Sequence, residues 1–342
     1  MTAATSRSSP LLVVVSIDTE EDNWKPARDG VSVTNIQALP ELHGMLRGFG
    51  IRPTYFTSYA VARTSWAANI IGDLVADGSG EIGAHLHPWN TPPLCEPFVP
   101  RNTMMKNLPV DLQAAKLITV TDTLEAAFGV RPTAFRAGRY GIGKDAAGLL
   151  ADHGYTVDSS ITPYLDWRYD DDGPDFRDAP MSIYRPSLTD ITKPARDGPI
   201  IEVPVSVGYT RSPFTRWARW HEHFERVRAG RVSLNSLATR IHFLRRLELS
   251  PETATASDML IVARNLACLG TRFVHVSWHS PSLVPGMSQF VPAVRERDAF
   301  VANVQRFFRR LGALFPLSHA TVSEAAELLE GRHAGAARHA LR

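Results

Sequence analysis

Residues 11–22 read Leu11-Leu12-Val13-Val14-Val15-Ser16-Ile17-Asp18-Thr19-Glu20-Glu21-Asp22. A run of branched apolar residues that ends abruptly in carboxylates predicts a buried strand, which delivers charged side chains to one rim of a sheet or barrel. Four carboxylates within five residues repel one another unless a cation, a proton or hydrogen-bond donors compensate them. Their partners should therefore lie downstream, and the candidates are His85, His87 and His279.

The composition is that of an ordinary soluble globular enzyme. Of the 342 residues, 44% are hydrophobic and 21% are charged, which excludes a largely disordered chain. The formal net charge of +2 gives no reason to expect a nucleic-acid partner. Cys95 and Cys268 lack metal-type spacing, so we expect neither a disulfide framework nor a thiolate metal site. Residues 1–10 do not resemble a signal peptide, and we expect a cytoplasmic protein.

A repeated pattern predicts the fold class. Residues 49–56 and 128–135 both read Phe-Gly-x-Arg-Pro-Thr-x-Phe. Each copy ends a helix with glycine, blocks its continuation with proline and starts a β run, as repeated βα units do. Counting such units gives about six or seven, which favours an α/β fold with a parallel β/α barrel. We expect a single domain over residues 11–330, between a flexible N-terminus at 1–10 and a flexible tail at 331–342.

A change of composition marks an insertion at about residues 211–250. Residues 211–246 contain nine arginines against two glutamates, with interleaved aromatic residues. We interpret this segment as inserted helices, because the βα pattern resumes with a predicted strand at residues 272–278. Three interpretations remain open: a solvated helical face, a lid over the site, or a surface that contacts anionic lipid-linked sugars.

Histidines follow two of the predicted strands. His85 and His87 are two residues apart, so they point to the same side if the backbone stays extended. Two imidazoles plus one carboxylate form a ligand set that leaves positions open for water and a substrate oxygen, as in metal-assisted hydrolysis. The alternative is a pair of inert, hydrogen-bonded histidines. On the strand at 272–278 and just after it, His275 and His279 share one face; we expect His275 to be a satisfied core histidine.

Five motifs then occur in order along the chain. They are Asp-Thr-Glu at 18–20, Glu-Ile-Gly-x-His at 81–85, Phe-Arg-Ala-Gly-Arg-Tyr-Gly at 135–141, Tyr-x-x-Asp-Ser-Ser-Ile at 155–161 and Ser-Trp-His-Ser-Pro-Ser at 277–282. In these motifs the sequence resembles the polysaccharide deacetylase family, also called the NodB-homology or carbohydrate esterase 4 family, from residue 12 to residue 325. The resemblance implies a distorted, incomplete barrel, one divalent metal ion and removal of an N-acyl group, usually acetyl, from an amino sugar. Zinc is the expected metal, with cobalt, nickel and manganese as alternatives.

The resemblance also implies roles for the residues that match. Asp18 would be the general base that takes a proton from the attacking water, and His279 the general acid that protonates the leaving amine. Glu20 and His85 would be metal ligands. Arg136 would keep Asp18 ionised through a charged hydrogen bond.

Two further positions complete the implied site. The backbone amide of Tyr140 would face the oxyanion, and Asp158 would tune the general acid. Trp24 and Trp89 follow the motifs closely, so we predict that they bind substrate by stacking on sugar faces, with core packing as the alternative.

The sequence departs from the common family pattern at three places. The second ligand histidine usually follows the first by four residues, but that position is Trp89 here, and His87 is the available ligand. Gly138 stands where an Arg-x-Pro pattern commonly has proline. The paired aspartates of the first motif are replaced by Asp-Thr-Glu, so Asp22 remains an alternative to Glu20 as the carboxylate ligand. Otherwise, we expect Glu21 and Asp22 to solvate the following loop or bond to its backbone.

We therefore predict a metal-dependent hydrolase that acts on a linear amide bond of an N-acylated amino sugar or glycan precursor. A catalytically inactive carbohydrate-binding protein and an amidase for a non-sugar amide are the alternatives. Peripheral contact with a lipid-linked substrate and the oligomeric state stay open. For the acidic run at residues 170–172 we expect solvation, with calcium binding as the alternative.

Overall fold

The computed structural model describes residues 10–23, 25–226 and 244–328. Trp24, nearly all of the two predicted flexible ends and the middle of the Arg-rich insertion lie outside these residues. In the described part of the chain, no helix combines the length and the apolar character that a membrane crossing needs.

The first strand, β1 (Leu11–Thr19), is buried along its whole length and pairs with three strands of a parallel sheet. One edge pairs with β9 (Phe273–His279). The other edge pairs first with β10 (Leu317–Ala320) and then with β2 (Thr54–Ser58). From β2 the sheet continues in parallel through β3 (Glu81–Leu86), β4 (Ala134–Ala137), β5 (Val157–Asp158) and β6 (Ile201–Glu202).

The sheet curls into an incomplete barrel. Because β10 pairs only with the N-terminal half of β1, the carboxyl rim is formed by β9 and β1 to β6, and the eighth strand stays at the other end. In the described residues, β6 and β9 do not pair directly. Ser206 bridges them instead, since its amide donates to the carbonyl of His275 at 3.2 Å. The predicted fold, a distorted and incomplete parallel barrel of about seven strands, is confirmed.

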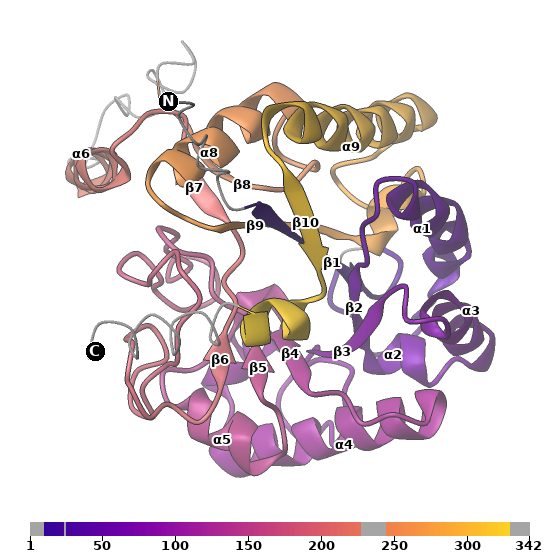
Figure 1. Ribbon diagram of the computed structural model, residues 1–342. Helices are drawn as coiled ribbons and strands as arrows, with labels where there is room; N and C mark the ends of the chain where they lie inside the picture. The colour runs from indigo at the N-terminus through magenta and orange to yellow at the C-terminus, as the bar shows by residue number, and fades with distance from the viewer. Residues whose placement is uncertain (1–9, 24, 227–243, 329–342) are drawn as a thin grey trace, which may run out of the picture.

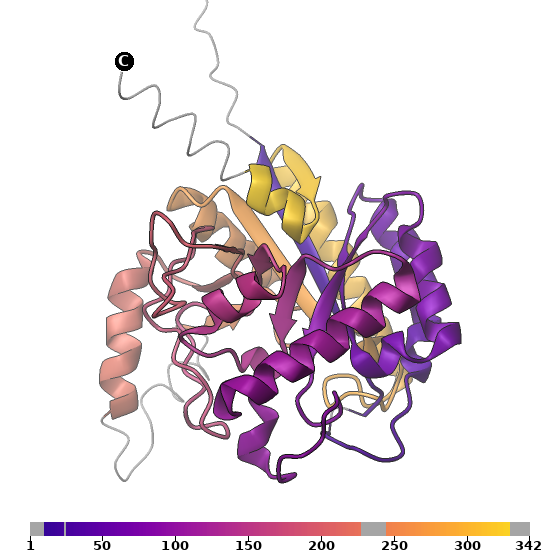
Figure 2. The ribbon, with the colours of Figure 1, turned by 90° about the horizontal axis from the view of Figure 1, so that it is seen from below.

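Helices cover the outside of the curled sheet (Figure 1). They are α1 (Leu39–Arg47), α2 (Tyr59–Ala62), α3 (Ser65–Val75), α4 (Val110–Phe128), α5 (Ala146–Asp152), α8 (Ala256–Cys268) and α9 (Val294–Leu314). Figure 2 shows the longest of the early helices, α4, lying across the outer face of the strands. The strands are buried on both sides, which explains why β1 reads as a continuous apolar run rather than an alternating one.

The repeated pattern has the predicted structure. Gly129 caps the C-terminus of α4 with a φ value of 70°, and Gly50 lies in the turn after α1 with a φ value of 74°. A residue without Cβ adopts this conformation at little cost. β2 and β4 begin at Thr54 and Ala134, just after the prolines of the two copies. The repeat therefore marks two helix-to-strand turns of the barrel.

The segment after β5 is irregular. Two short strands follow, β6 and then β7 (Val207–Tyr209), because Pro204 between them cannot donate a ladder hydrogen bond. β7 pairs in antiparallel fashion with β8 (Arg246–Glu248), and α6 (Phe214–Arg226) begins between them. The three interpretations of the Arg-rich insertion depend largely on residues outside the described part and stay predictions.

A buried lysine fixes the loop that follows β3. Lys116 of α4 is fully buried, and its Nζ donates to the carbonyls of Pro88, Thr91 and Pro93 at 2.9, 2.7 and 2.7 Å. The same group lies 3.2 Å from a carboxylate oxygen of Glu96. One side chain therefore satisfies several groups of the loop that begins at the end of β3.

We predict that Lys116→Met destabilises the protein by roughly 3 to 5 kcal/mol, because it takes the buried donor from three carbonyls and leaves Arg28 as the remaining cation at the Glu96 carboxylate. Urea denaturation measures this. Asp122→Asn on the same helix, whose side chain is 65% exposed, is the control and should change the stability by less than about 0.5 kcal/mol. Equal stability of Lys116→Met and wild type would show that the lysine does not fix the loop.

Candidate metal and catalytic centre

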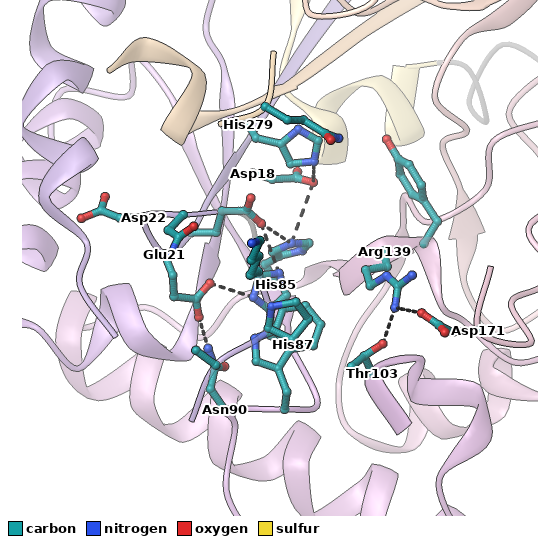
Figure 3. Close-up of a pocket in the computed structure, with 18 of the residues that line it drawn as sticks. Asp18, Glu21, Asp22, His85, His87, Asn90, Thr103, Arg139, Asp171 and His279 are labelled. Carbon is teal, nitrogen blue, oxygen red and sulfur yellow. Dashed lines mark hydrogen bonds and ion pairs between the residues drawn. The ribbon is translucent and has the colours of Figure 1, made fainter. Parts of the chain in front are cut away.

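A cavity of about 810 Å³ opens at the carboxyl rim of the barrel. Asp18, His85 and His279 line it and come from the ends of β1, β3 and β9. In the pairing of β1 with β9, Asp18 lies directly beside His279. Strands far apart in sequence thus bring the predicted catalytic and ligand residues into one space (Figure 3).

Glu20, His85 and His87 form a compact set of potential ligands. Their ligand atoms all lie within 4.8 Å of one another, and all three residues are buried. Glu20 Oε2 is 3.2 Å from Nε2 of His87 and 3.5 Å from Nε2 of His85. Burial raises the pKa of Glu20, but the charge of His279 and the two histidine hydrogen bonds outweigh it, so the pKa lies well below its usual value. A carboxylate is therefore present among the imidazoles.

Hydrogen bonds behind the histidines orient them for metal binding. His85 Nδ1 lies 3.1 Å from the carbonyl of Arg136, and His87 Nδ1 lies 2.8 Å from Oε2 of Glu21. A proton on Nδ1 leaves the Nε2 lone pair directed at Glu20, which is the arrangement found around metal-bound histidines. Burial lowers the pKa of His87, yet Glu21 and Glu20 outweigh this and raise it to about 10. The same excess of negative charge favours a divalent cation, so the residues fit the predicted metal.

The carboxylates at the end of β1 have separate partners. Asp22 accepts hydrogen bonds from Ser32, Thr34 and Asn35, at 2.5 to 2.8 Å, and points away from the histidines in Figure 3. This geometry agrees with the loop role predicted for Asp22 and does not support it as the metal ligand. The prediction for Glu21 is wrong. Its carboxylate is turned inward, where it bonds to His87 and to the amide of Asn90.

A buried arginine holds Asp18. Nη1 of Arg136 donates to Oδ1 of Asp18 at 2.6 Å and to Oγ of Ser277 at 2.9 Å, and the guanidinium lies over the ring of Phe56 at 4.3 Å. Oδ2 of Asp18 is left to face the cavity, 3.8 Å from Nε2 of His85 and 3.7 Å from Nε2 of His279. The structure therefore brings Arg136 to Asp18 as predicted.

Glu252, a residue that no sequence motif indicated, holds His279. Its Oε2 lies 2.9 Å from Nδ1 of His279, and its Oε1 accepts from the backbone amide of His279 at 3.2 Å. Ser282 donates to the same carboxylate. Burial lowers the pKa of His279, but Glu252 and Glu20 outweigh it and raise the pKa to about 10. No sequence pattern connects Glu252 with the motif at 277–282. The folded structure alone brings them together.

The implied role of Asp158 in tuning His279 needs correction. Asp158 is fully buried, accepts from Oγ of Ser160 at 2.6 Å and lies beside Glu202 in the pairing of β5 with β6. Burial raises the pKa of both carboxyl groups. Asp158 and Glu202 thus form a buried pair of acids. Glu252 is the carboxylate that contacts His279.

Two departures from the family pattern are one structural change. A Cβ on Gly138 would lie 2.5 Å from Cδ2 of His87 and 2.8 Å from the carbonyl oxygen of Leu86. The ring of His87 therefore occupies the space that a side chain at 138 would need. Trp89 stacks on this ring, with centroids 4.1 Å apart and an interplanar angle of 24°. His87 in this position thus requires glycine at 138, while sugar stacking by Trp89 stays a prediction.

Arg139 and Tyr140 turn the chain into the cavity, with φ values of 55° and 54°. Arg139 pairs with Asp170 at 2.8 Å and with Asp171 at 2.7 Å, and Figure 3 shows the Asp171 pair away from Glu21. The acidic run at 170–172 is therefore ion-paired rather than simply solvated. The hydroxyl of Tyr140 donates to Oε1 of Glu248 at 2.8 Å, and the role of its backbone amide stays a prediction.

His275 is a core residue, as we expected, but its Nδ1 has no hydrogen-bond partner among the described residues. It is fully buried, and its Nε2 is 2.8 Å from Oγ of Ser16 on the neighbouring strand. Burial and the charge of Arg136 hold its pKa well below the usual value, so the ring is neutral. This histidine belongs to the barrel wall.

No protein-family model matches the sequence, and no curated protein matches it either. Among solved structures, the chain is similar to a protein from Mycobacterium smegmatis assigned as a polysaccharide deacetylase, at 18% identity over 96% of both chains with a TM-score of 0.54. It is also similar to the allantoinase PuuE, at 12% identity over 92% of this chain and 89% of that one, with a TM-score of 0.50. The chain therefore has the fold of the polysaccharide deacetylases. At these identities the likeness establishes the fold alone.

We predict that Gly138→Ala weakens divalent-metal binding by about 10- to 100-fold, because the new methyl group displaces His87. Isothermal titration with zinc measures the affinity. Gly72→Ala is the matched control, since a Cβ there meets only Phe128 at an ordinary 3.8 Å within α3. If Gly138→Ala binds zinc as tightly as Gly72→Ala, then His87 does not depend on the space at 138.

Proposed function

We propose that this protein is a metal-dependent hydrolase that removes an N-acyl group, acetyl in the first instance, from an amino sugar or a glycan precursor. One observation carries the proposal: an Arg-held aspartate and a Glu-held histidine lie side by side next to the set of Glu20, His85 and His87. A general base, a general acid and a cation site in one large cavity are the parts that amide hydrolysis needs.

The ligand set supports zinc, with cobalt, nickel and manganese as alternatives, because two imidazoles and a carboxylate suit these metals. When bound there, the ion supplies a Lewis acid that polarises the acyl carbonyl and makes water more acidic. Glu21 holds His87 in the tautomer that offers Nε2, and the carbonyl of Arg136 does the same for His85. Each ligand is thus positioned by a residue of a neighbouring segment.

Asp18 has the position of a general base. Arg136 binds one of its oxygens and leaves the other facing the cavity, so a water there can transfer its proton to Oδ2. The buried guanidinium provides the opposite charge beside this carboxylate. Asp18 is thereby available to accept a proton without rotating.

His279 has the position of a general acid. Glu252 accepts from Nδ1 and stabilises the imidazolium, while Nε2 faces Asp18 and the cavity. A proton on Nε2 can be transferred to the amine as the C–N bond breaks. The product amine then leaves through the open end of the cavity.

An amino sugar is the proposed substrate because the five ordered motifs match a family with that activity, and the size of the cavity agrees with it. The volume of about 810 Å³ lies in the range of pockets that enclose a ligand of several rings. Trp89 and Trp167 both line this cavity, where aromatic faces can pack against sugar rings.

We expect the protein loaded with zinc to release acetate from N-acetylated glucosamine oligomers. Asp18→Asn should lower the rate by roughly 100- to 10,000-fold, since it removes the proton acceptor and keeps the shape of the side chain. Metal content, measured by mass spectrometry, should stay at one ion in this variant and fall in His85→Ala.

Three other results would contradict the proposal. Sugar binding without acetate release under any of the four metals would favour a carbohydrate-binding protein. Release from small non-sugar amides only would favour an amidase. Acetate release that survives in Asp18→Asn would remove the assigned base.

The role of His279 as general acid predicts a pH effect. His279 must be protonated, and Glu252 is the main group that raises its pKa. Activity should therefore fall as the pH rises through that pKa. In Glu252→Gln, this basic limb of kcat/KM should move to lower pH by roughly 1 to 3 units. An unmoved basic limb would mean that His279 is not the group that titrates there.

A further inference from the structure

The cavity wall contains more negative than positive side chains. Of the described residues that line it, the permanent cations are Lys25 and Arg139, and the imidazoles of His87 and His279 add positive charge when protonated. The carboxylates are Asp18, Glu20, Glu21, Asp22, Asp170, Asp171, Glu248 and Glu252. Even with a divalent ion bound, this balance disfavours a substrate that carries a carboxylate.

Seven of these eight carboxylates have partners that already compensate them. Arg136 binds Asp18, Arg139 binds Asp170 and Asp171, and histidines contact Glu20, Glu21 and Glu252. Asp22 is surrounded by donors of its own loop. These seven carboxylates are therefore already bound by groups of the protein.

Glu248 differs from the rest. It lies at the end of β8, on the cavity wall near His279 and Glu252. Among the described residues, its hydrogen-bond donor is the neutral hydroxyl of Tyr140, which binds Oε1 at 2.8 Å. Oε2 is left for a ligand. Tyr140 thus holds the carboxyl group in place without neutralising it.

We infer that Glu248 is a specificity-determining residue, whose Oε2 accepts a hydrogen bond from a free amino group of the substrate. The cavity then selects partly deacylated, cationic amino-sugar chains over carboxylated ones. This inference rests on the proposed function, since it names the substrate class of the same site. Burial raises the pKa of Glu248 to about 7, and an ammonium group beside it would favour the ionised form.

The test compares three glucosamine tetramers of equal length: fully N-acetylated, with one free amino group, and with one carboxylated sugar. Their dissociation constants are measured by titration calorimetry in the zinc-loaded Asp18→Asn background, where turnover does not interfere. We expect the cationic tetramer to bind about tenfold tighter than the neutral one, and the carboxylated tetramer to bind weakest. In Glu248→Gln, the cationic and neutral tetramers should bind equally.

Two further variants separate a specific contact from general charge. Asp170→Asn removes one charge from the same wall, where Asp170 is already paired with Arg139, and should retain the tenfold preference. Tyr140→Phe keeps the Glu248 carboxyl group but removes the donor that holds it, so the preference for the cationic tetramer should fall. This variant tests the contact where Glu248→Gln does not fold, and an unchanged preference in it would then overturn the inference. An unchanged preference in folded Glu248→Gln, or equal loss of preference in Asp170→Asn, would overturn the inference. Because binding is measured without turnover, absent acetate release would contradict the proposed function and leave this comparison intact.

Discussion

The site depends on one electrostatic constraint, the burial of several carboxylates where β1 meets the cavity. Each needs a compensating partner, because desolvation and mutual repulsion both oppose ionisation. Arg136 compensates Asp18, and His87 with Asn90 compensates Glu21. Glu20 faces two imidazoles, where a divalent cation would complete the balance. The acidic cluster is thus a set of distinct groups, each fixed by a different strand or loop.

The same constraint explains why the ligand geometry can differ from the common family pattern. With its ring packed beneath Trp89 and tied to Glu21, His87 reaches Glu20 from a position two residues after His85. This placement needs an empty space at Gly138. A change of ligand position therefore involved the residue behind the ligand and the aromatic residue beside it, which are contributed by different strand ends.

Much of this architecture can be read from the sequence, because strand ends of a parallel barrel converge at one rim. That rule predicts that the acidic cluster of β1 meets His85, His87 and His279, and in the structure Asp18 lies beside His279. Contacts made by single side chains from inserted or distant segments could not be read in this way. Glu252 lies in no motif, and Lys116 is one lysine in a long helix, so only the folded chain shows their partners. The resemblance implied a role for Asp158 beside the general acid, but a matching motif does not determine the neighbour of a side chain, and the folded chain places Asp158 beside Glu202.

The central claim is that Glu20, His85 and His87 bind one divalent ion, and an anomalous-scattering crystal structure of zinc-soaked protein tests it most directly. We expect one anomalous peak about 2.0 to 2.2 Å from Nε2 of both histidines and from a carboxylate oxygen of Glu20. An anomalous peak beside Asp22 instead would contradict the claim. So would well-ordered electron density for these three side chains with no anomalous peak between them.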